Sequence, residues 1–188
     1  MRRSFAFLLA TYLAAPVFAA DETAMLDEAR KVASGIPPKL LKVLTEEIKN
    51  GGPEGAIAVC REKAPQMAAA ASAETGWAIR RVSLKNRNPK AVPDAWERAV
   101  LEDFDKRATA GEKPAALERG EVVADGDKKI YRYMKALPTQ ELCLSCHGAP
   151  ERLTPAVKAK LETLYPADMA VGYGLDAVRG AITLKRPL

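Results

Sequence analysis

The chain has 188 residues, 48% of them hydrophobic, and a formal net charge of +5. That length and apolar content are typical of one globular domain with a substantial core, and the lack of repeats, low-complexity tracts and glycine-serine linkers argues against a multidomain or disordered chain. The charge is too mild to indicate nucleic acid as a partner, so we expect none.

Residues 1–19 have the composition of a secretory signal peptide. Two arginines form the charged start, residues 5–13 form an apolar stretch, and small residues lead up to Ala19. A retained membrane anchor is the alternative, but the apolar stretch is short for a membrane span. We predict cleavage after Ala19 and export to the periplasm, which leaves one domain over residues 20–188 with no transmembrane segment. Removal of two arginines and no acidic residue lowers the net charge from +5 to +3.

Two helices are predicted in the next part of the chain. The first ends at Gly51-Gly52, and its apolar face is formed by Leu40, Leu41, Leu44 and Ile48. The second is alanine-rich and covers residues 53–73, with Pro53 suited to its first turn. Pro65 is expected to break or kink this helix, because proline cannot continue the hydrogen-bond ladder. Cys60 lies on the apolar face of the second helix, about one turn before that proline.

The following elements are strands and one more helix. Residues 77–84 are rich in branched side chains and predict a strand. Pro93 opens a helix whose apolar side holds Trp96, Val100, Leu101 and Phe104. A hairpin is expected at Asp125-Gly126, and a last strand over residues 181–184. A few antiparallel strands with helices gathered on one side predict an α+β domain.

The segment Cys143-Leu144-Ser145-Cys146-His147 has the C-x-x-C-H spacing of a c-type haem attachment site. The two thiols would form thioether bonds to the haem vinyl groups, and the adjacent imidazole would bind the iron. We therefore predict one covalent haem c, and we expect the motif in a loop because Pro138 precedes it and Gly148 follows it. A redox-active disulfide is one alternative. A zinc site is another, but the sequence holds no second cluster of ligands.

The opposite side of the iron needs a different residue, because His147 is the only histidine in the chain. Haem attachment uses two of the three cysteines and leaves Cys60 over. The pattern of residues allows Cys60 to be an iron ligand or a buried small hydrophobe. A lysine, a tyrosine, water or an open position are further possibilities, as are the methionines Met25, Met67, Met134 and Met169.

Other side chains are candidates for contact with a haem. A basic run contains Arg80, Arg81, Lys85 and Arg87. Such a run is commonly a solvated surface, but a guanidinium also matches the geometry of a propionate carboxylate. Three aromatic residues have the same two interpretations, as porphyrin contacts or as ordinary core residues: Trp77, Tyr131 and Tyr133.

Several blocks of sequence together resemble the DUF3365, or Tll0287-like, family. The blocks cover residues 55–65, 76–97, 131–137, 143–148 and 179–184. The resemblance implies an exported c-type haem protein with a PAS-like domain, in which helices flank a small antiparallel sheet and further helices precede it. It also implies axial ligation of the iron by His147 and Cys60. Members of this family are sometimes the extracytoplasmic part of a sensor protein.

Three classes of function remain. A redox or small-ligand sensor would exchange an iron ligand, whereas an electron-transfer cytochrome would keep both ligands in each redox state. A peroxidase-type enzyme is disfavoured, because it needs an open iron face with a distal acid–base residue, usually histidine. We expect the sensor, with a soluble periplasmic electron-transfer cytochrome as the alternative. The expected partner is a redox protein or a separate signalling protein.

Overall fold

The structure, a computed structural model, describes residues 17–188. Most of the predicted signal peptide, residues 1–16, lies outside the described residues. The helices and strands are α1 (Val17–Thr75), β1 (Ala78–Val82), α2 (Ala95–Thr109), β2 (Glu118–Asp125), β3 (Lys128–Pro138), α3 (Glu141–His147), α4 (Pro155–Leu164) and β4 (Val178–Pro187). Short 3₁₀ helices cover Pro89–Ala91, Pro114–Ala116 and Pro150–Arg152.

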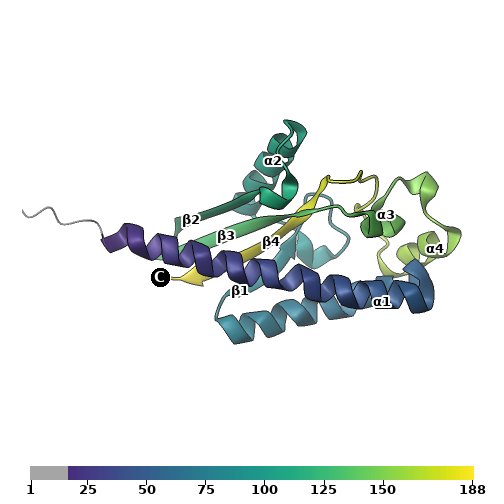
Figure 1. The fold of residues 1–188 in the computed structure, drawn as a ribbon, viewed down its shortest axis with the longest axis horizontal. Helices are drawn as coiled ribbons and strands as arrows, with labels where there is room; N and C mark the ends of the chain where they lie inside the picture. The colour runs from purple at the N-terminus through teal and green to yellow at the C-terminus, as the bar shows by residue number, and fades with distance from the viewer. Residues whose placement is uncertain (1–16) are drawn as a thin grey trace, which may run out of the picture.

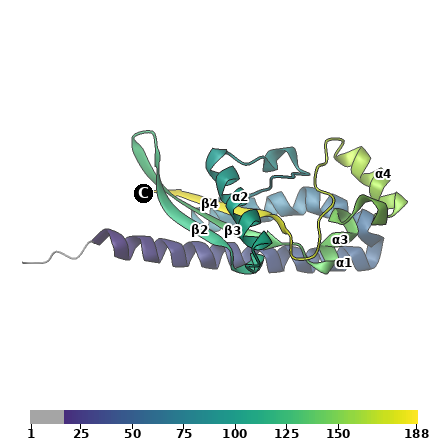
Figure 2. The ribbon, with the colours of Figure 1, turned by 90° about the horizontal axis from the view of Figure 1, so that it is seen from above.

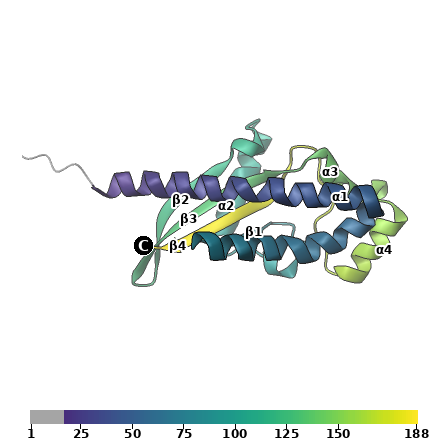
Figure 3. The same ribbon diagram turned by 60° about the horizontal axis from the view of Figure 1, so that its bottom comes forward.

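The long segment α1 is a helical hairpin with two arms. Gly52 has a positive φ of 70° and a ψ of 174°, which no helix allows, so the chain turns there and runs back beside itself (Figures 1 and 3). The predicted helix end at Gly51-Gly52 is therefore confirmed. The predicted break at Pro65 is wrong, because the second arm keeps helical dihedrals through that residue as far as Thr75.

The sheet has four antiparallel strands in the order β1-β4-β3-β2. The predicted hairpin is confirmed: β2 and β3 pair from Glu118↔Lys135 to Asp125↔Lys128, and Gly126 takes a φ of 62° in the two-residue turn. The last strand lies in the middle of the sheet, between β1 and β3. Together with the helices, the sheet makes the α+β fold that the sequence predicts.

Helices cover both faces of the sheet, contrary to the expectation that they gather on one side (Figure 2). Side chains alternate across a strand, so neighbouring residues of β4 face opposite ways. Ala181 joins the α2-side core, with Val82, Val100, Leu101, Phe104, Leu117, Met134, Ala136 and Val178. Ile182 joins the α1-side core, with Met25, Ala29, Ala33, Trp77, Tyr131, Tyr133 and Leu184.

A third, smaller core lies where the turn of α1 meets α3 and α4, a region we call the hairpin end (Figure 1). Ile57 from the second arm packs there against α4 and the segment after it, in a cluster with Leu153, Val157, Leu161 and Tyr165. Cys146 packs on the same cluster. Among the described residues, no helix combines the length and apolar character that crossing a membrane requires.

Candidate functional site

The C-x-x-C-H motif lies on the short helix α3, not in the loop that we expected. Gln140 is the N-cap residue and its carbonyl accepts a hydrogen bond from the Cys143 amide at 2.9 Å. Pro138 and Gly148 therefore lie on either side of a short helix, and they do not prevent one from forming. Cys143 and Cys146 are three residues apart and His147 is four from Cys143, so all three lie on one helix face. Gly148 ends the helix. A Cβ at this position would lie 2.6 Å from the Leu144 carbonyl oxygen, which is too close, so the backbone here favours glycine.

The second arm of α1 brings Cys60 to this face. Cys146 Sγ lies 3.7 Å from the carbonyl oxygen of Pro53, the residue that starts the arm, and Ile57 and Cys146 belong to the same hydrophobic cluster. Burial raises the pKa of the Cys60 thiol. The opposing influence on that pKa comes first from Arg81 and then from Arg87, so cations face the thiol.

His147 is held as a neutral imidazole. Its Nδ1 lies 2.6 Å from the Ala170 carbonyl oxygen, which can only accept, so the proton belongs on Nδ1 and the Nε2 lone pair is left for a metal. Burial lowers the pKa of His147 well below its ordinary value, and the charges of Arg179 and Arg87 lower it further. A ligand histidine commonly has this arrangement, because the second hydrogen bond orients the ring.

A segment that we call the strap, residues 168–173, fastens the motif to the rest of the domain. The Tyr173 amide donates to the His147 carbonyl at 2.9 Å, and the Gly172 amide donates to that of Gly148 at 2.8 Å. Arg87 joins both parts: it donates to Asp168 at 2.9 Å and, through Nη2, to the Cys146 carbonyl at 2.6 Å. Arg87 is therefore a structural clamp on the motif.

The four cations of the predicted basic run go to different places. Arg80 points to the α2 side and pairs with Glu97, while Lys85 is exposed and donates to the Val171 carbonyl at 2.9 Å. Arg87 is the clamp. Arg81 is half-buried, and its guanidinium makes no hydrogen bond or ion pair within residues 17–188. Arg81 and the buried Arg179, which the sequence analysis did not single out, are the two arginines near the motif that form no ion pair with a carboxylate among residues 17–188.

A family model described as Tll0287-like matches residues 16–187, nearly the whole chain. The chain belongs to the Tll0287-like family. Among solved structures it is similar to the cyanobacterial haem protein Tll0287, with a TM-score of 0.61 and 24% sequence identity, over 89% of this chain and 95% of that one. At that identity the likeness shows the fold alone. No curated protein matches the chain.

Of the two interpretations of the three aromatic candidates in this Tll0287-like chain, the structure favours ordinary core residues. Trp77 and Tyr131 pack edge to face, 6.1 Å apart, inside the α1-side core, and Tyr133 is buried in the same core. Tyr173 takes their place beside the motif, with its ring 6.3 Å from that of His147 at an interplanar angle of 88°. No local pattern pointed to Tyr173, because its position depends on the strap pairing with α3.

The structure bears on the alternative uses of these residues. Cys60, Cys143 and Cys146 are all free thiols. Among residues 17–188 no group of three or more histidine, cysteine, aspartate or glutamate side chains is arranged to hold a bare metal ion, so the zinc hypothesis gains no support. Two of the methionine candidates, Met25 and Met134, are buried in the two sheet-side cores.

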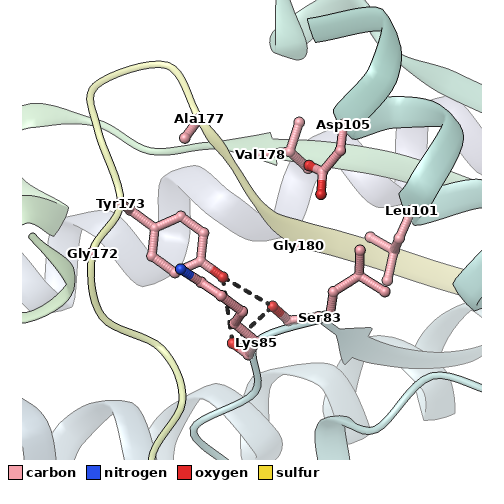
Figure 4. A pocket seen from close by; sticks show the side chains of 10 residues that line it. Ser83, Lys85, Leu101, Asp105, Gly172, Tyr173, Ala177, Val178 and Gly180 are labelled. Atoms are coloured by element: carbon pink, nitrogen blue, oxygen red, sulfur yellow. Dashed lines mark hydrogen bonds between the residues drawn. The ribbon is translucent and has the colours of Figure 1, made fainter. Parts of the chain in front are cut away.

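A cavity of about 300 Å³ has Tyr173 in its wall (Figure 4). Its walls come from the segment after β1, from α2, from the segment before β4 and from the start of β4: Ser83, Leu84, Lys85, Leu101, Asp105, Gly172, Tyr173, Ala177, Val178 and Gly180. The Tyr173 hydroxyl lies 3.5 Å from Ser83 Oγ. None of the cysteines or His147 lines this cavity, so it is separate from the cluster of donor side chains.

Proposed function

We propose that this chain is an exported c-type haem protein that holds one haem at the hairpin end. Cys143 and Cys146 would carry it covalently, and His147 and Cys60 would be the axial ligands. The observation that carries the proposal is the state of His147: its Nδ1 is tied to the Ala170 carbonyl on a helix face that also presents both thiols of the motif. Membership of the Tll0287-like family, which includes a haem protein of the same fold, supports it.

The residues at the hairpin end fit a haem in three respects. The donor set contains two adjacent thiols and an imidazole that is neutral, as a metal ligand must be. Cys60 comes from a different element, the second arm of α1, and would supply a thiolate donor in addition to the His147 imidazole. Arg179 has a buried Nε without a hydrogen-bond partner, which an acidic group of the cofactor would satisfy.

We propose a sensor of redox state or of a small ligand as the biological role. A bound haem supplies one-electron chemistry and an iron that can bind a small molecule. Within the part of the chain that the structure describes, the Cys60 thiol is free and half-buried, and no side chain or backbone group makes a hydrogen bond to its sulfur. Its arm runs directly into β1, so a movement of Cys60 would reach the sheet through one continuous helix. An electron-transfer cytochrome is the alternative, with a redox protein as partner in place of a signalling protein.

The first experiment tests covalent haem. Expression with an export signal and a c-type maturation system should give a periplasmic protein whose haem stain survives denaturing electrophoresis. The Cys143→Ser/Cys146→Ser variant, a matched control that keeps His147 and Cys60, should lose the stain. A colourless wild-type protein with a Cys143–Cys146 disulfide would reject the proposal.

The second experiment tests the Cys60 ligand and separates the two roles. Cys60→Ser should retain the stain but lose the thiolate-type spectrum and have a higher reduction potential, because an anionic donor is gone. Met67→Leu on the same arm is the control and should keep the wild-type spectrum. In the reduced wild type, carbon monoxide should bind by replacing Cys60 if the protein is a sensor, and should bind poorly if it is an electron carrier.

A further inference from the structure

Three arginines act on the donor side chains of the motif and of Cys60, and only one of them has a carboxylate partner among residues 17–188. Arg81, Arg87 and Arg179 all act on the same groups: each lowers the pKa of His147, and each opposes the rise in the pKa of Cys60. Asp168 is the one carboxylate among residues 17–188 that pairs with any of the three, and its partner is Arg87. Two guanidinium groups therefore remain without an anion.

Arg81 points into the site from β1. It pairs across the sheet with Ile182, whose side chain lies in the α1-side core, and directly paired residues of antiparallel strands point to the same face. Arg81 therefore faces the helical hairpin. The charges that act on its guanidinium include those of Cys60, Cys143 and Tyr173. Burial lowers its pKa, and no described residue accepts a hydrogen bond from it.

Arg179 approaches from β4 and is 5% exposed. Its Nη1 donates to Ser83 Oγ at 3.1 Å and lies 3.4 Å from the Lys85 carbonyl oxygen, and its guanidinium lies 5.0 Å from the centre of the Tyr173 ring. Its Nε is buried without a partner. Arg132 also has an unpartnered Nε, but Asp94 and Glu97 compensate its charge. Arg179 has no such carboxylate.

We infer that Arg81 and Arg179 form a binding site for two carboxylates, and that these are the propionates of the haem. The inference rests on the proposed function and assigns the orientation of the same cofactor. Two propionates carry the two negative charges that the unpaired arginines lack. A guanidinium presents parallel N–H donors to a carboxylate, so such a pair is geometrically specific. The attached edge would face α3, and the propionate edge would face β1 and β4.

The experiment compares holoproteins with Arg81→Gln and Arg179→Gln against wild type. Both variants should keep the haem stain, because the motif is untouched, and both should have a lower midpoint reduction potential, because a cation that stabilises the reduced form is lost. The resonance Raman band of the propionates should shift in each variant. Arg179→Lys keeps the charge without the paired donors, so it should restore the potential but not the band.

Arg80→Gln is the matched control. It removes the same charge from the same strand, but on the opposite face and next to Glu97, so both the potential and the propionate band should stay at the wild-type values. A lowered potential with an unchanged band would reject the inference, since it would mean that the arginines act only through space. A wild-type band typical of solvated propionates would reject it without any variant. In those cases the haem stain persists, whereas failure of the proposed function would leave the wild type colourless.

Discussion

The sheet and the hairpin end are stabilised in different ways. At the sheet, two large cores surround the strands, and several charged side chains have partners, as Arg186 has in Glu28 and Arg132 in Asp94 and Glu97. At the hairpin end the core is small and the three thiols are free. The two arginines that approach it from β1 and β4, Arg81 and Arg179, form no ion pair among the described residues.

In the sheet the protein's own contacts satisfy many of the charged and polar groups. At the hairpin end a bound ligand would satisfy the groups that the protein leaves without partners. Buried donors and uncompensated charges cost free energy, so a chain retains them where something else satisfies them. The sheet therefore provides the stable frame, and the hairpin end holds the chemistry. A substitution in the sheet should therefore leave the absorption spectrum of the haem unchanged, and a substitution of an iron ligand should leave the fold of the sheet intact.

The largest effect is expected for His147→Ala, which should abolish the native ligation altogether. The sequence has no other histidine to take its place. Haem should stay attached through Cys143 and Cys146, so electrophoresis should still show the stain while the absorption spectra of both redox states change. Tyr173→Phe, which keeps the ring beside His147, should leave the spectra close to wild type. An unchanged spectrum in the alanine variant would contradict the assignment.

In the α2-side core that packs on the sheet, Phe104→Ala should lower the free energy of unfolding by about 3–5 kcal/mol, because it empties a fully buried site. Ile57→Val at the hairpin end removes one methyl group and should cost about 0.5–1.5 kcal/mol. Denaturant titrations of the holoproteins would measure both. Each variant that folds should keep the wild-type spectrum. Altered ligation in Phe104→Ala would show that the two regions are not separable.

The clamp at the hairpin end should be the most sensitive ion pair. Arg87→Met leaves Asp168 unpaired where both side chains are only 10% exposed, so the loss in unfolding free energy should be about 3 kcal/mol. Arg107→Met is the control: its pair with Glu112 is 35% and 51% exposed and should be worth about 0–1 kcal/mol. Equal losses of unfolding free energy in the two variants would show that the Arg87–Asp168 pair contributes no more than an exposed ion pair.

The smallest effect concerns acid stability of the sheet. Hydrogen bonds from Arg186 and Trp77 lower the pKa of Glu28 below its ordinary 4.5. Burial opposes the same change in Glu118, but the hydrogen bonds from Arg30 and Tyr133 outweigh it and lower its pKa. A lowered folded-state pKa gives stability above the unfolded value that is lost as the pH falls. Unfolding free energy should therefore decline from about pH 4.5 downwards, and less steeply in Glu28→Gln.

Local signals in the sequence determined much of the frame. The hairpin at Asp125-Gly126 was predictable because a two-residue turn with positive φ needs glycine at that place. The helix that Pro93 was expected to open begins at Ala95, where Asp94 as N-cap and Glu97 form a reciprocal cap with each other's backbone amides. The spacing of Cys143, Cys146 and His147 identified a candidate site without any structure, because that chemistry depends on five consecutive residues.

Tertiary structure alone decided how the site is completed. The sequence could not separate Arg81 from Arg80, because the face that each takes depends on pairing with β4, about a hundred residues later. Tyr173, Ala170 and Arg179 carried no local signal, since they reach His147 only through the strap and the central position of β4. Local patterns report backbone geometry and short-range chemistry, whereas partners distant in sequence are chosen by packing and by charges that meet only in the folded chain.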